Sequence, residues 1–162
     1  RRLEKTAGAL CQALSLDEEA TGHALRAATL CKTDLLTEMV GEFPSLQGRM
    51  GRIYAEIEGE PGPVAAAIEE HYMPVSAGAD LPETVTGRVL SLADKFQTLC
   101  DCFALDLRPS GSRDPYGLRR SALGMIRILE ASGMKLDVDS IVSSALRVAP
   151  GDMSKERLEA IT

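Results

Sequence analysis

Residues 82–103 carry the sequence PETVTGRVLSLADKFQTLCDCF. Large apolar side chains recur in it every three or four residues, which is the spacing of one face of an α-helix. A proline at the start of the stretch suits the first turn of a helix. We therefore predict one long helix that starts near Pro82 and buries an apolar stripe made of Val85, Val89, Leu92, Phe96, Leu99 and Phe103.

The helical period continues before this stretch. We expect Asp17 to cap a helix that runs to about Val40, and Ser45 to cap a helix that reaches Glu58 and is stopped by Gly59. After a turn at residues 60–63 a short helix should reach residue 72, and residues 73–81 should form a loop because they contain proline and glycine.

The helical spacing of apolar residues also continues after residues 82–103. Asp114 is expected to cap a helix with Pro115 at its first position, and this helix should end at Gly133. Further helices are expected from Asp137 and from Ser154. Since no segment alternates between apolar and polar residues, we predict an all-α bundle of about seven helices without a sheet.

The composition fits one domain with an aliphatic core. The chain has 162 residues, of which 44% are hydrophobic and only 4% aromatic. Its formal charge of −6 argues against a protein that coats nucleic acid non-specifically, although a local basic patch stays compatible with phosphate contacts. There is neither an apolar run of about 20 residues nor a signal peptide. We expect a cytoplasmic protein without a membrane partner.

The ends of the sequence bear on the domain organisation, and its cysteines bear on metal binding. The chain begins at Arg1 and stops inside a helical pattern, so we expect one domain, residues 1–162, excised from a longer chain. Its four cysteines lack the spacing of a zinc knuckle, and we predict buried free thiols.

Four motifs resemble the β chain of bacterial heterotetrameric glycine–tRNA ligase. They are Lys32–Phe43 continued by Leu46-Gln47-Gly48 and Met50-Gly51, then Glu70-His71-Tyr72 with Pro74, then Leu92–Lys95, and finally Asp114–Arg120. Each motif alone is weak, but four in the family's order are specific. The resemblance covers roughly residues 26–146.

The resemblance implies a helical domain similar to the HD superfamily. It also implies that a separate α chain handles glycine and ATP, while the β chain binds tRNA. The expected partners are therefore glycine-accepting tRNA, the α chain and the rest of the β chain, in a heterotetramer. No cofactor is expected in this domain, although the full enzyme uses ATP.

Working HD phosphohydrolases hold metal with a lone His, a His-Asp dyad and a later Asp. The two histidines here, His23 and His71, do not precede Asp. We interpret His71 and Asp94 as degenerate positions of that pattern, and we expect Asp94 and Lys95 to form an ion pair. His23 and Asp34 share one helical stripe and are expected to be core residues, satisfied by the backbone or by a cation such as Lys95. No metal site and no catalytic residue are predicted.

Basic residues gather in the segment 108–127. It holds five arginines against one acid, Asp114: Arg108, Arg113, Arg119, Arg120 and Arg127. On the last helix of this segment, an apolar stripe of Leu118, Ala122, Met125 and Leu129 lies opposite Gly117, Arg120, Gly124 and Arg127. Glycine inside a helix costs up to ~1 kcal/mol against alanine, so a bare strip flanked by arginine suits the close approach of a phosphate. The alternatives are a solvated basic face, or glycines packed on another helix.

We therefore expect a tRNA-handling domain of the ligase's β chain. It would be non-catalytic by itself and would support the ATP-dependent attachment of glycine to tRNA at the α chain's site. One alternative is a structural module that orients neighbouring domains of the β chain, for which charge changes near Arg120 leave tRNA affinity untouched. The other is an HD-type metal phosphohydrolase, which needs the missing His-Asp dyad.

Overall fold

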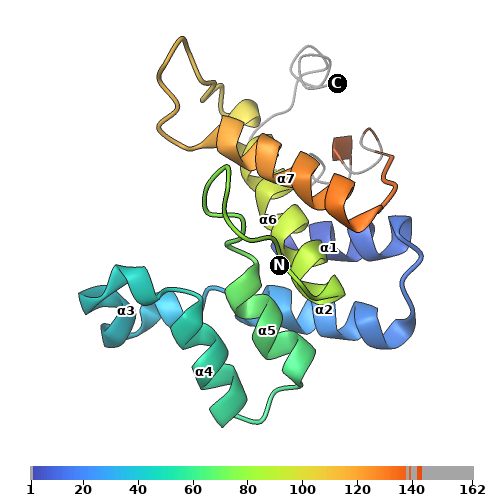
Figure 1. Cartoon of the computed structure of the whole chain (residues 1–162), viewed down its shortest axis with the longest axis vertical. Helices are drawn as coiled ribbons and strands as arrows, with labels where there is room; N and C mark the ends of the chain where they lie inside the picture. The colour runs from blue at the N-terminus through green and yellow to red at the C-terminus, as the bar shows by residue number, and fades with distance from the viewer. Residues whose placement is uncertain (1, 138, 140–141, 144–162) are drawn as a thin grey trace.

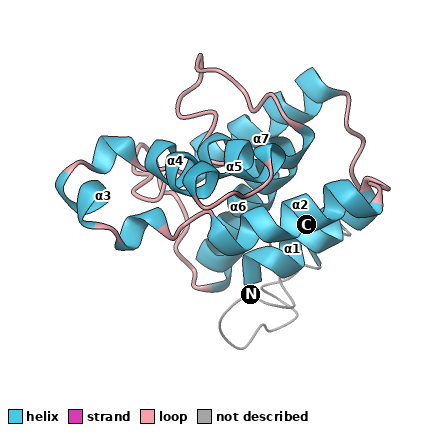
Figure 2. Ribbon diagram, turned by 90° about the horizontal axis from the view of Figure 1, so that it is seen from below, coloured by secondary structure: helices cyan, strands magenta, loops and turns pink. Residues whose placement is uncertain are grey.

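The computed structural model describes residues 2–137, 139, 142 and 143, and every regular element in that part of the chain is helical (Figures 1 and 2). Two 3₁₀ helices, η1 (Asp34–Leu36) and η2 (Pro44–Leu46), flank a short α-helix. The α-helices are α1 (Arg2–Ala13), α2 (Glu18–Leu30), α3 (Glu38–Glu42), α4 (Arg49–Ile57), α5 (Gly62–Glu70), α6 (Val85–Ala104) and α7 (Leu118–Ser132). The predicted all-α class is confirmed for the described residues. The likeness to the HD superfamily stays a prediction, because an all-α architecture identifies no superfamily.

Helix α6 is the centre of the bundle and packs against α1, α2, α5 and α7 (Figure 1). It begins at Val85, where the side chain of Thr84 accepts a hydrogen bond from the N–H of Gly87 at 2.9 Å. Val89 and Phe96 of the predicted stripe are buried, whereas Val85 is exposed. The stripe therefore enters the core one turn later than the sequence predicted, because the helix starts three residues after Pro82 rather than at it.

Small side chains let the helices of this bundle approach closely. Alanines on α1, α2 and α5 are fully buried beside the larger Leu10, Ile68 and Leu92. A core of this kind needs few aromatic residues, because helices that approach closely leave little space between them for bulky side chains to fill. No helix among the described residues is long and apolar enough to cross a membrane.

The helix predicted from Asp17 to Val40 is shorter than expected. Asp17 does cap its start, since its carboxylate accepts the N–H of Ala20 at 2.8 Å, but α2 ends at Leu30. The hydroxyl of Thr33 donates to the Leu30 carbonyl at 2.8 Å. Side chains that bond the nearby backbone in this way compete with helix continuation, and η1 and α3 follow as separate elements.

The predicted cap at Ser45 is wrong. Ser45 lies inside η2, and α4 starts at Arg49 after Gly48, whose φ is +77°. A side chain at Gly48 would be strained at that φ, and its Cβ would lie 2.7 Å from Cδ2 of Tyr72. Tight packing on Tyr72 and the left-handed backbone thus fix where this helix begins.

The remaining boundaries are closer to the prediction. Helix α5 ends at Glu70, residues 73–81 form the expected loop, and α7 ends at Ser132, before Gly133. The helix predicted after Asp137 falls largely on residues outside the described part of the chain, and the one predicted from Ser154 falls wholly outside it.

Candidate functional site

The basic segment forms an extended loop, residues 105–117, followed by α7. Figure 1 shows this loop at the upper end of the bundle. The loop carries Arg108 and Arg113, and α7 carries the other three arginines. Arg108 already has partners: its Nε lies 3.0 Å from Oδ1 of Asp106, and its guanidinium lies over the Phe103 ring. An exposed pair of this kind adds little stability, but it neutralises Arg108 locally.

Asp114 caps α7 although it lies four residues before the helix begins. Its two carboxylate oxygens accept the N–H groups of Leu118 and Arg119 at 2.8 and 2.9 Å. The predicted capping role is therefore confirmed, but the predicted helix start at Pro115 is wrong. Gly117 adopts a left-handed φ of +64° between Pro115 and Leu118, which interrupts the helical path before α7 begins.

Three of the predicted arginines are available to an outside partner. Arg113, Arg119 and Arg120 are exposed and form no ion pair with any residue that the structure describes. The guanidinium of Arg120 folds back over the turn, where its Nη2 lies 2.6 Å from the position that a Cβ on Gly117 would take. Unpaired guanidinium groups at one end of a helix offer several donors to an anion.

Arg127 has a structural partner inside the domain. It donates to the carbonyl oxygens of Ser76 and Ala79, at 3.3 and 3.0 Å, and so ties the loop 73–81 to α7. The sequence placed Arg127 on a solvent face opposite the core. Its half-buried position shows instead that it helps to hold this loop.

The predicted bare strip along α7 is covered at Gly124. A Cβ there would lie 3.2 Å from Cγ of Pro74 and 3.3 Å from Cε of Lys95. Gly124 is therefore a packed glycine, the alternative that the sequence left open, although its neighbours are a loop and a lysine of α6. Ala122 and Leu129, expected in the buried stripe, are only half-buried, and Ile128 is buried in their place.

A groove of about 590 Å³ lies between α7 and the loop 73–81. Its apolar lining includes Pro74, Ala77, Leu123 and Ile126. Its charged lining consists of three arginines and two acids: Arg119, Arg120, Arg127, Asp114 and Glu130. Sequence reasoning missed this groove. The available signal was the pair Leu123 and Ile126, two large apolar residues on the arginine-rich face of α7.

A second hollow, of about 320 Å³, is also lined by Arg120. It is lined by Tyr72, Pro74, Lys95 and Thr98 among others, and by both degenerate positions, His71 and Asp94. The structure thus brings these two residues together with one of the predicted tRNA-binding arginines. Nothing in the spacing along the chain predicted that juxtaposition.

His71 is fully buried and neutral at physiological pH. Its Nδ1–H donates to the carbonyl of Ile68 at 2.7 Å, which leaves Nε2 as an acceptor without a partner among the described residues. Burial, followed by the nearby Lys32 ammonium, lowers the pKa of His71 from 6.5 to about 4. A neutral imidazole of this kind is a poor proton donor at neutral pH.

Asp94 pairs with Lys32 and not with Lys95. The Lys32 Nζ lies 2.9 Å from Oδ1 of Asp94, so the predicted Asp94–Lys95 pair is wrong. The Lys95 ammonium donates instead to the carbonyl of Met73 and to the Ser91 hydroxyl, both at 2.8 Å. Burial lowers the pKa of Lys95 from 10.5 to about 8. Lys95 therefore fastens the turn after α5 to α6.

Asp34 and His23 do not share a helical stripe, because α2 ends between them. Oδ2 of the buried Asp34 accepts the N–H of Gly48 at 2.6 Å, which confirms the expected backbone partner for that oxygen, whereas Oδ1 has no hydrogen-bond partner among the described residues. His23 is half-buried on α2. Among the described residues, no three His, Cys, Asp or Glu side chains lie close enough together to hold one metal ion.

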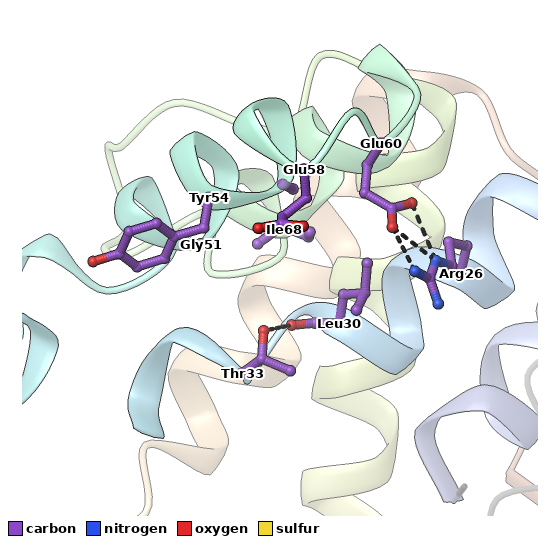
Figure 3. A pocket seen from close by; sticks show the side chains of 9 residues that line it. Arg26, Leu30, Thr33, Gly51, Tyr54, Glu58, Glu60 and Ile68 are labelled. Carbon is purple, nitrogen blue, oxygen red and sulfur yellow. Dashed lines mark hydrogen bonds and ion pairs between the residues drawn. The ribbon is translucent and has the colours of Figure 1, made fainter. Parts of the chain in front are cut away.

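Figure 3 shows a further pocket, of about 340 Å³, lined by residues of α2, α4 and α5. Arg26 and Glu60 point toward one another at its edge, and both carboxylate oxygens accept from the guanidinium (Figure 3). This pair ties α2 to the turn before α5. We interpret the pocket as part of the packing between these helices.

The cysteines behave as predicted. All four are free and buried. Burial raises the pKa of the Cys31 thiol and that of the Cys100 thiol from 9.0 to about 12. The thiolate is the nucleophilic form, so these side chains are inert packing residues at neutral pH.

Comparison with known proteins identifies one family. The sequence model described as "Glycyl-tRNA synthetase beta subunit" matches residues 1–161 of this chain. The glycine–tRNA ligase β subunit of Geotalea daltonii is 50% identical over 136 residues, which are 84% of this chain and 20% of that protein.

The β subunits of two further organisms give the same result. The corresponding β subunit of Halalkalibacterium halodurans is 48% identical over 142 residues, 88% of this chain and 20% of its own length. That of Streptococcus gordonii is 46% identical over 160 residues, 99% of this chain and 24% of its own length. The chain therefore spans about a fifth to a quarter of the length of these curated relatives.

Proposed function

The chain belongs to the family of glycyl-tRNA synthetase β subunits, and on that premise we propose that it helps to place tRNA for aminoacylation. In this proposal it forms no bond itself. The α chain of the ligase uses ATP to attach glycine, while the present domain holds the tRNA backbone through Arg113, Arg119 and Arg120. The single observation that carries the proposal is that these three arginines, one in the loop 105–117 and two in the first turn of α7, are exposed and form no ion pair within the described residues.

The position of two of these arginines supports an anionic partner. Arg119 and Arg120 lie in the first turn of α7, and that turn contains no acidic residue. Cations at a helix N-terminus are unfavourable by typically 0.3–1 kcal/mol, on the order of a weak ion pair. Asp114 offsets part of this cost by capping the helix. Two arginines at a place where stability alone favours acids are consistent with a site selected for binding phosphate.

The overall charge of the chain restricts where a nucleic acid can bind. The chain carries a formal charge of −6, so its general field repels nucleic acid. A tRNA that meets the chain would be held only where positive groups are concentrated. Arg120 borders both the apolar groove and the hollow at His71, so a backbone held there would pass between two recessed surfaces.

The structural-module alternative also has an observation in its favour. Arg108 is paired with Asp106, and Arg127 is bonded to the loop 73–81, so two of the five arginines have internal partners. If all five served the domain's own architecture, reversing the charge at Arg120 would leave tRNA use unchanged. The two functions therefore differ in a measurable way.

The test is kinetic and uses the complete ligase with both chain types. We expect Arg119→Glu and Arg120→Glu each to raise the KM for tRNA about five- to tenfold, because each replaces a phosphate contact with repulsion. Glycine-dependent ATP–pyrophosphate exchange should stay within about twofold of wild type, since the same proposal assigns that step to the α chain. Arg49→Glu, at an exposed arginine on α4, is the matched control. An unchanged KM for tRNA in both α7 variants would favour the structural module.

A further inference from the structure

The segment Asp34–Leu46 protrudes from the bundle, at the lower left of Figure 1 and the left edge of Figure 2. It contains η1, α3 and η2, whose main contacts are with one another. Four large apolar side chains of this segment face solvent, here called the apolar knob: Leu35 (44% exposed), Leu36 (89%), Met39 (41%) and Phe43 (57%). Several large apolar side chains exposed within one short segment are typical of an interaction surface.

The knob is held in a fixed shape. The buried carboxylate of Asp34 accepts the N–H of Gly48 at 2.6 Å and so closes the segment at its base. The Thr37 hydroxyl donates to the carbonyl of Asp34 at 2.7 Å, and Val40 is the buried residue of α3. A five-residue helix is unstable alone, so these anchors hold the outward-facing side chains in place.

The charge of the knob points to protein rather than RNA as its partner. Residues 33–48 contain no Lys, Arg or His, while Glu38 and Glu42 are exposed on α3. The carboxylates of Glu38 and Glu42 repel a phosphate backbone, and no cation in residues 33–48 offsets that repulsion. Apolar side chains beside carboxylates fit an apolar hollow with basic residues at its edge. The knob also lies far along the molecule from the arginine-bearing loop 105–117 (Figure 1).

The size of the knob indicates how that partner is attached. Four side chains present on the order of a few hundred Å², whereas a stable interface between separate proteins buries roughly 800 Å² on each side. A small patch suffices when its partner is tethered, because the effective concentration is then of order mM. The matched relatives have about four-fifths of their length outside the matched stretch. We propose that the knob docks into an apolar, basic-rimmed hollow elsewhere in the same β polypeptide.

The test uses the full-length β chain that contains this sequence, with and without the α chain. Leu36 is replaced by photoreactive p-benzoylphenylalanine, which its high exposure permits. Irradiation should give an intrachain product with the mass of one β chain, in which position 36 is linked to a peptide outside residues 1–162. The same probe at Ile57, an exposed apolar residue outside the knob, should not give that cross-link.

A second variant tests the surface itself. Phe43→Asp, combined with the probe at position 36, should reduce the intrachain cross-link at least about fivefold, whereas Ile57→Asp should not. A cross-link to the α chain, a cross-link between two β chains, or no cross-link would each overturn intrachain docking. Because the knob and the arginines of α7 are assayed separately, failure of one proposal leaves the other standing.

Discussion

His71 is a histidine that the fold keeps neutral. Burial and Lys32 lower its pKa from 6.5 to about 4, so between these pH values the unfolded chain binds a proton that the folded chain excludes. The stability due to neutral His71 is therefore complete above pH 6.5 and is lost as the pH falls towards 4. The loss is at most ~3.5 kcal/mol, at about 1.36 kcal/mol per pKa unit.

The variant His71→Asn tests this dependence. Its amide can still donate to the Ile68 carbonyl, but it does not titrate. Urea unfolding at several pH values between 7 and 4 should therefore show a smaller loss of unfolding free energy for His71→Asn than for wild type. Equal acid dependence of the two proteins would mean that His71 is not the group responsible.

Two glycines inside helices predict opposite outcomes. A Cβ on Gly87 would lie 2.8 Å from Cβ of Glu70, whereas a Cβ on Gly22 meets nothing within 4 Å. Glu70 is not free to move, since its carboxylate accepts from the N–H groups of Glu83 and Thr84. In thermal unfolding we expect Gly87→Ala to cost about 1–3 kcal/mol and Gly22→Ala to gain roughly 0.5–1 kcal/mol. A Gly87→Ala chain as stable as wild type would refute the close packing of α5 on α6.

At the scale of elements, α6 offers a matched pair of valines one turn apart. Val89 is fully buried and Val85 is 42% exposed. Val89→Ala should cost about 2 kcal/mol, from the two lost methyl groups and the cavity that they leave. Val85→Ala should cost less than ~0.5 kcal/mol. Similar unfolding midpoints for the two variants would show that the phase of α6 is wrong.

Local signals predicted the helices, and distant contacts set the boundaries that were missed. The apolar period located α6, and Asp17 and Gly133 marked the ends of α2 and α7, because each signal acts within one turn. After α2 ends at Leu30, Asp34 accepts the N–H of Gly48, which lies fourteen residues further along the chain. The spacing of apolar residues along the chain cannot predict a contact of that kind.

In the candidate site, too, the sequence predicted the local features and missed the contacts between distant residues. The arginines of the segment 108–127 were evident from composition, but the loop that covers Gly124 was not, because loop packing has no period. The sequence already argued against the predicted Asp94–Lys95 ion pair, because adjacent residues on a helix point in different directions. Asp94, which lies on α6, pairs with Lys32 instead. The single-domain boundary, residues 1–162, stays a prediction.

For the whole molecule, charge is unevenly distributed. The net charge is −6, yet Arg113, Arg119 and Arg120 lie unpaired near one end of α7, while the apolar knob at η1, α3 and η2 carries Glu38 and Glu42. An acidic protein with one basic end orients a polyanion toward that end. In the two proposals taken together, one region of the domain meets tRNA and another is anchored to the rest of the β polypeptide.

The most direct measurement is a tRNA titration of the complete ligase between about 50 and 200 mM salt. We compare wild type, the double variant Arg119→Ala/Arg120→Ala, and Arg49→Ala as the control. Each lost phosphate contact should reduce the slope of log affinity against log salt by roughly 0.7–0.9. The double variant should therefore bind more weakly at low salt, with a slope smaller by roughly one to two, while Arg49→Ala should match wild type. An unchanged affinity and slope in the double variant, with its helix content intact by circular dichroism, would contradict tRNA contact at α7.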